Sequence, residues 1–145
     1  MIPQFLASSW FRYLLVLGGL NLVWEIAQLP FYTLWTSSPL PVIAYDVIHC
    51  TIGDFLIATI CSIAALAPLR WRWPGTRGHI ALFLSLIVAF GVAYTIYSEW
   101  LNVTVRKSWS YSDLMPLLPP LDTGLSPVLQ WLLLPVLSFF VARKL

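Results

Sequence analysis

The residues best suited to chemistry gather in one short stretch of a chain that is otherwise strongly apolar. Spacings of three and four residues place several of them on one face of a helix. Carboxylate, imidazole and thiolate groups are ligands of zinc and other transition metals. The stretch therefore predicts either a metal site or a group of side chains that transfer protons. Its members are Asp46, His49, Cys50, Gly53 and Asp54.

Two further acidic residues each lie on a polar face of their own. Glu25 follows an asparagine by four residues and precedes a glutamine by three, so the three side chains share a narrow helical face. Glu99 has the same kind of neighbours near the end of a later apolar stretch. We expect these neighbours to support the carboxyl groups by hydrogen bonds. They are Asn21 and Gln28 beside Glu25, and Ser98 and Asn102 beside Glu99.

The elements that carry these residues are apolar enough to cross a membrane. Of the 145 residues, 59% are hydrophobic and only 10% are charged, against roughly 25% charged residues in soluble domains. A membrane-spanning helix needs roughly 20 apolar residues, and four stretches approach that length. The sequence predicts a single all-α transmembrane domain over residues 1–145, an up-down bundle of four helices. The expected spans cover residues 11–31, 42–67, 79–101 and 126–142, with an interfacial loop over 102–124.

Proline residues mark the breaks between these spans. Pro30 closes the first span and Pro68 the second, because proline removes a backbone donor and clashes with the preceding helical turn. Pro127 suits the first turn of the fourth span, where its missing N–H costs nothing. Pro135 lies inside that span and predicts a kink.

The positive charges predict one orientation in the membrane. Short cytoplasmic loops carry an excess of Lys and Arg. An up-down path would place six such residues at one end of the bundle and two at the other, so we expect both termini to be cytoplasmic. Short loops and the absence of a secretory signal pattern favour the bacterial inner membrane. The majority end holds Arg12, Arg70, Arg72, Arg77, Arg143 and Lys144, and the outer end holds Arg106 and Lys107.

The same path brings the three polar faces to one level of the membrane. They occupy the second half of the first span, the first half of the second and the last turn of the third, all on the outward side. An ionisable group within a membrane costs about 2.5 to 3.5 kcal/mol on insertion scales. Glu25 and Asp54 lie deepest, and we expect them to share a proton. The alternative is that the polar residues only join the helices through interhelical hydrogen bonds.

The first functional hypothesis is a membrane-embedded enzyme that acts on a lipid or isoprenoid-like substrate. Glu25, Asp54 and Glu99 would act as general acids and bases, and His49 would orient a group or relay a proton. In a metal-assisted variant, Asp46, His49 and Cys50 would hold an ion such as zinc and Glu25 would complete the site. The segment 106–116 could form a lid over the site. The expected substrate-facing and lid residues are Trp24, Tyr94, Trp109, Tyr111 and Met115.

Two other functions stay open. A glutamate in the first of four spans resembles the small multidrug resistance exporters, and this resemblance implies binding or transport of a cation. It covers only the span count and Glu25, and those exporters tolerate both orientations, whereas the charge bias here favours one. Eight tryptophans and few charges also suit an accessory subunit of a larger membrane complex, or a homo-oligomer, surrounded by membrane lipids. A nucleic-acid partner is not expected, because the sequence has no basic face.

Overall fold

Four long helices dominate the computed structural model, which describes residues 4–145. Each is long and apolar enough to cross a membrane, so the prediction of four such helices is confirmed. The structure thus supports a helical membrane protein. The helices are α1 (Gln4–Gln28), α3 (Leu40–Leu66), α4 (Arg77–Glu99) and α5 (Leu125–Ala142).

Short elements extend or connect the long helices. Three-residue 3-10 turns continue α1 and α3, and one helical turn, α2, lies between them. A π-helical segment continues α4, so its helical backbone runs past the predicted end at residue 101. A two-stranded antiparallel hairpin precedes α5. These elements are η1 (Leu29–Phe31), α2 (Leu34–Ser37), η2 (Ala67–Leu69), η3 (Trp100–Val105), β1 (Leu117–Leu118) and β2 (Thr123–Gly124).

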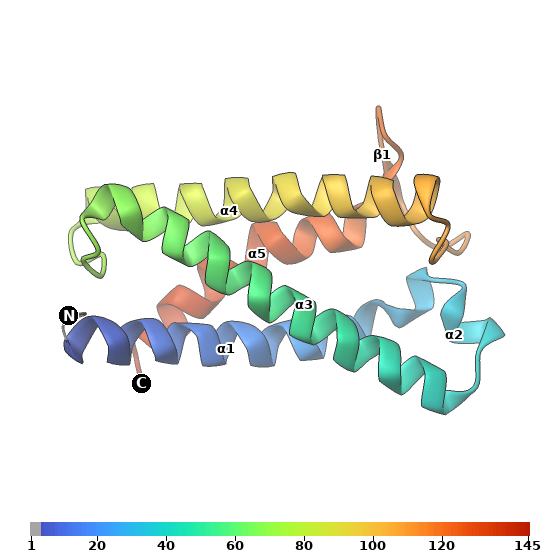
Figure 1. Ribbon diagram of the computed structural model, residues 1–145, viewed down its shortest axis with the longest axis horizontal. Coiled ribbons are helices and arrows are strands. Elements are labelled where there is room, and N and C mark those ends of the chain that lie inside the picture. Colours follow the sequence, from blue (N-terminus) through green and yellow to red (C-terminus); the bar gives the residue numbers. More distant parts are fainter. Residues whose placement is uncertain (1–3) are drawn as a thin grey trace.

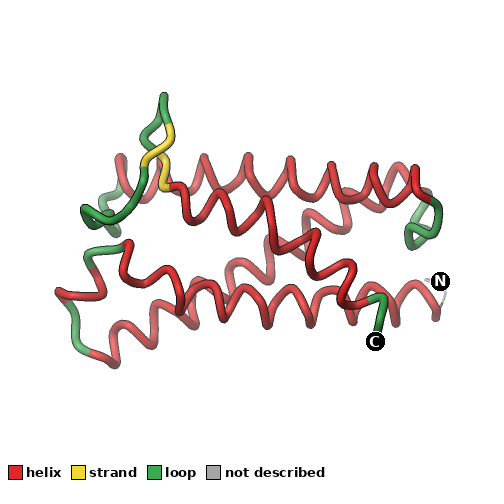
Figure 2. The backbone as a smooth tube through the Cα atoms, turned by 180° about the vertical axis from the view of Figure 1, so that it is seen from behind, coloured by secondary structure: helices red, strands yellow, loops and turns green. Residues whose placement is uncertain are grey.

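The helices form a ring in which each packs against two others. Helices α3 and α5 both contact α1 and α4. In Figure 1, α3 crosses diagonally in front of α1 and α4, and α5 crosses behind them. Figure 2 shows the same arrangement from behind. Helices α3 and α5 thus approach the centre of the bundle from opposite sides.

The two ends of the bundle differ in what they carry. The N-terminus and the α3–α4 connection lie at one end, towards which the C-terminal segment also runs, and α2 and the hairpin lie at the other (Figure 1). The α3–α4 connection reverses tightly, with left-handed backbone at Arg70 (φ 54°) and Trp71 (φ 60°). Thr76 then caps α4 by accepting a bond from the His79 backbone N–H at 3.3 Å. The separation of the basic residues into two ends follows the predicted path.

An aromatic cluster holds the helices together near the end that carries the termini. Tyr13, Trp73, Phe83 and Phe139 come from different parts of the chain, and their ring centroids lie 5.4 to 6.5 Å apart. Such tilted and edge-to-face contacts are favourable for aromatic pairs. This half of the bundle is therefore closed by apolar packing, which fixes the helices that carry the polar half.

Candidate functional site

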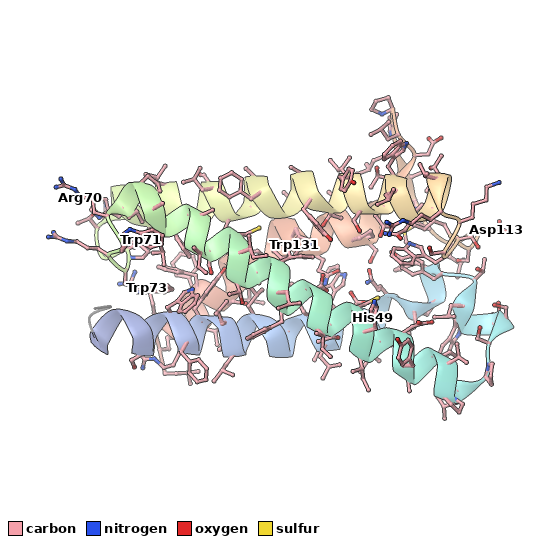
Figure 3. The ribbon with its side chains drawn as sticks, in the orientation of Figure 1. His49, Arg70, Trp71, Trp73, Asp113 and Trp131 are labelled. Atoms are coloured by element: carbon pink, nitrogen blue, oxygen red, sulfur yellow. The ribbon has the colours of Figure 1, made fainter. Side chains whose placement is uncertain are left out.

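A cavity of about 810 Å³ lies in the other half of the bundle. Side chains from α1, α3, α4, α5 and residues 106–110 form its wall. Figure 1 shows α3 and α4 diverging towards this end, and Figure 3 shows His49 on α3 within the same half. The sequence-predicted acidic and supporting residues in the wall are Glu25, Gln28, Asp46, His49, Cys50, Asp54, Ser98, Glu99 and Asn102.

Glu25 and Asp54 meet through a single amide nitrogen. Gln130 Nε2 donates to Asp54 Oδ2 at 2.7 Å and to Glu25 Oε1 at 3.3 Å. The same nitrogen lies 3.2 Å from Asn21 Oδ1. Both carboxyl oxygens lie within 3.3 Å of this one nitrogen, so the two carboxyl groups are neighbours in the structure. Two neighbouring carboxyl groups repel each other when both are ionised, so this arrangement favours a proton on one of them.

A second amide donates to the same oxygen of Glu25. Gln28 Nε2 donates to Glu25 Oε1 at 2.8 Å. Ser126 Oγ, on α5, donates in turn to Gln28 Oε1 at 2.9 Å. Gln28 and Ser126 are both buried, so this chain of bonds is shielded from water. Helix α5 therefore orients Glu25 both directly and through α1.

Glu99 has hydroxyl rather than amide partners. Tyr32 donates to Glu99 Oε2 at 3.4 Å, and Tyr111 donates to the same oxygen. The Gly124 backbone N–H donates to the Tyr111 hydroxyl oxygen at 2.9 Å, which ties α5 to the contact. Burial, followed by the charge of Glu99, raises the pKa of Tyr32 and of Tyr111 above the usual tyrosine value. Both phenols therefore stay protonated as donors.

One oxygen of each carboxyl group is left without such a donor. Amide and hydroxyl groups of the described residues reach only Glu25 Oε1, Asp54 Oδ2 and Glu99 Oε2. Their second oxygens are not among the buried atoms that lack a partner. These second oxygens are thus available to a neighbouring carboxyl group or to a molecule in the cavity.

Asp46, His49 and Cys50 line the cavity but do not converge on one point. The His49 ring stacks on Tyr45, with ring centroids 5.8 Å apart and planes 16° apart, and both side chains are exposed. Within residues 4–145, no three His, Cys, Asp or Glu side chains form a group that could hold a metal ion. The metal site stays a prediction.

The segment expected to act as a lid is fastened by hydrogen bonds to residues that follow α1. The Thr33 backbone N–H donates to Ser110 O at 3.0 Å, and that of Ser112 donates to Phe31 O at 2.9 Å. Trp109 lines the cavity and borders Glu99.

The other residues expected to face the substrate divide into two groups. Tyr94 also lines the cavity. Met115 is buried and lies within contact distance of a Cβ built at Gly124, and Trp24 packs on the hydrophobic core. Met115 and Trp24 are therefore placed apart from the cavity wall.

Three residues of the site were not foreseen from the sequence. Gln130 and Ser126 lie on α5, which was expected only to complete the bundle, and Tyr32 lies in a connection. The four-residue step between Ser126 and Gln130 puts both on one helical face, and this was the available signal. No family model, curated protein or solved structure matches the chain. The site is accordingly interpreted from its own geometry.

Proposed function

We propose that this protein is a membrane-embedded enzyme that uses acid–base chemistry on a lipid or isoprenoid-like substrate. The observation that carries the proposal is the Glu25–Asp54 pair in the wall of a cavity between diverging helices. A pair that shares one proton can accept a proton through one carboxyl group and return one through the other. General acid–base catalysis needs such groups within hydrogen-bonding reach of the reacting atoms.

Glu99 supplies a separate acid–base group in the same cavity. Its donors are phenols, whereas those of Glu25 and Asp54 are amides. Two carboxyl sites in different environments can hold different protonation states, which is how many enzymes divide the roles of acid and base. The open oxygen of each carboxyl group is the atom at which a proton would be exchanged with substrate.

A lipid-like substrate is favoured by the position of two cavity residues. His49 on α3 and Tyr94 on α4 both line the cavity and are exposed on the surface of the bundle. His49 lies nine residues into α3, about 14 Å along its axis, within a span. Ionisable side chains at such a level usually face a cavity or a functional path. A substrate could therefore pass from the bilayer into the cavity between α3 and α4.

The proposed site opens on the side opposite to the cytoplasm. This follows from the positive-inside rule, with Arg70, Arg72 and Arg77 in the cytoplasmic loop of a bacterial inner-membrane protein. Cys50 lines the cavity, whereas Cys61 is buried in the core.

We predict that a membrane-impermeant thiol reagent added outside intact cells labels Cys50 and not Cys61. The reason is that only Cys50 borders a space that opens outward. Labelling is measured by mass spectrometry of the purified protein, and Cys50→Ser should abolish it. If labelling occurs only with inverted vesicles, the proposed orientation is wrong.

A cavity-filling variant tests the function. Gly53 lines the cavity, and a Cβ built there meets nothing within 4 Å, so Gly53→Leu should occupy the cavity without displacing a neighbour. The protein is reconstituted in vesicles of total bacterial lipid extract, and lipids are quantified by mass spectrometry over time. Wild-type protein is expected to consume a lipid species, and Gly53→Leu to reduce that consumption at least tenfold.

Gly19→Leu is the matched control. Gly19 also has nothing within 4 Å of a built Cβ, but it lies in a separate groove between α1 and α3. This variant should consume lipid at the wild-type rate. The proposal fails if wild-type protein leaves every lipid unchanged, or if both leucine variants behave alike.

Cation binding is the second candidate, because four carboxyl groups border one cavity. Asp46 joins Glu25, Asp54 and Glu99 in the wall, and carboxylates are suited to cations of many kinds. Metal analysis of the purified protein distinguishes the two functions. A stoichiometric metal that is lost in His49→Ala would favour cation binding.

A further inference from the structure

Gln130 is the residue on which the acidic pair depends most directly. Its side chain is 2% exposed, in the first half of α5. The amide nitrogen reaches Asn21 and Glu25 on α1 and Asp54 on α3. One side chain thus connects three helices at the level of the carboxyl groups.

The Gln130 amide has fewer N–H groups than there are oxygen atoms around its nitrogen. A primary amide has two N–H groups, whereas three oxygen atoms lie within 3.3 Å of Gln130 Nε2. The contact with Asp54 is the shortest, at 2.7 Å. The side-chain nitrogen of Asn21 is buried without a partner, so Asn21 contributes only its oxygen to the group.

A proton between Glu25 and Asp54 would complete this set of hydrogen bonds. Two ionised carboxylates this close repel each other, and a single shared proton removes the repulsion. Gln28 and Gln130 donate to Glu25 Oε1, and Gln130 donates to Asp54 Oδ2. The second oxygens, Glu25 Oε2 and Asp54 Oδ1, receive no hydrogen bond from these amides and are left to carry the proton. The other ionisable groups near the pair are Glu99 on α4, Cys50 on α3 and Tyr32, which follows η1.

We infer that Gln130 is a positioning residue, whose side-chain amide holds Glu25 and Asp54 at the separation at which they share one proton. It lines the same cavity and acts through the two carboxyl groups. The inference deepens the proposed function, since it names the residue that keeps the proposed acid–base pair intact.

Infrared spectroscopy of the full-length protein in lipid tests the inference. The carbonyl band of a protonated carboxyl group reports directly on the shared proton. In wild-type protein this band is expected to change in both Glu25→Gln and Asp54→Asn. Gln130→Met keeps a similar side-chain volume but removes the amide. In the Met background, Asp54→Asn should leave the remaining carbonyl band in place, because the two carboxyl groups are no longer coupled.

Ser138→Ala is the matched control on the same helix. Ser138 is fully buried and its hydroxyl has no partner, so this variant should keep the wild-type band and its dependence on both carboxyl groups. A Gln130→Met spectrum that matches wild type in position and in both dependences overturns the inference.

A second measurement applies if Gln130→Met does not fold. The side-chain amide resonance of Gln130, labelled with ¹⁵N in otherwise unaltered protein, should shift in Glu25→Gln and again in Asp54→Asn. No shift in either variant overturns the inference. None of these readouts depends on lipid consumption. If the protein consumes no lipid, the proposed enzymatic function is refuted, but the inferred role of Gln130 is not affected.

Discussion

Glu25→Gln and Asp54→Asn are each expected to slow lipid consumption by about 10²- to 10⁴-fold, the range that general acid–base catalysis contributes. Each change preserves the size of the side chain and removes its ability to exchange a proton. The amide partners Gln28 and Gln130 stay in place, so the fold should persist. Initial rates in reconstituted vesicles measure the effect, with circular dichroism as the check on folding.

The two substitutions should not be additive. Because the carboxyl groups are expected to act as one unit, the double variant should be about as slow as the slower single variant. Asp122→Asn is the control: Asp122 is exposed near the hairpin and has a positive φ of 51°, a conformation that Asn accepts well. It should retain the wild-type rate. Full activity in both single variants would remove Glu25 and Asp54 from the mechanism.

The helical framework was accessible from the sequence because hydropathy alone determines which stretches can span a membrane. Each of the four stretches predicted to span a membrane contains a helix that is long and apolar enough to do so. The end of the third was misplaced because its polar residues suggested a loop. In the structure the backbone continues as a π-helical segment, with the Arg106 N–H bonded to Leu101 O at 2.7 Å. Hydropathy does not distinguish a polar helical turn from the start of a loop.

Two features of the sequence predict the candidate site: the rotational position of each residue on its helix, and the direction in which each helix runs. These place Glu25, Asp54 and Glu99 at one level, and the cavity wall contains all three. They do not reveal which other helix supplies hydrogen bonds, and so Gln130 on α5 was missed. Trp24 precedes Glu25 by one residue, but one residue is about 100° of helical rotation. Its indole therefore packs on the core.

The spacing of residues along a helix does not determine the distances between their side-chain atoms. Those distances depend on contacts in the folded structure. Asp46, His49 and Cys50 share a wedge of α3, as their spacing predicts. A metal site would further require that their ligand atoms turn towards one point, which spacing along a helix does not determine, and the metal site stays a prediction. The spacing also did not reveal the direction of the His49 ring, which stacks on Tyr45 of the same helix.

Gly91→Ala is expected to destabilise the folded bundle by about 1–3 kcal/mol, the usual cost of adding a carbon to a packed core. A Cβ at Gly91 would lie 2.1 Å from Trp131 Cε3, so the indole or the helix must move. Trp131 is 3% exposed and has little room to do so. Thermal or denaturant unfolding in a constant detergent measures the change.

Gly53→Ala separates this clash from the general effect of alanine in a helix. Gly53 has open space around its built Cβ, so alanine there should be neutral or should stabilise by up to about 1 kcal/mol. Equal stabilities for the two variants would contradict the close approach of α4 and α5.

Trp131 adjoins Gln130 in sequence, and a displaced indole should also disturb the amide at Glu25 and Asp54. We therefore expect Gly91→Ala to alter the carbonyl band as well, since the packing of these two helices positions the donor.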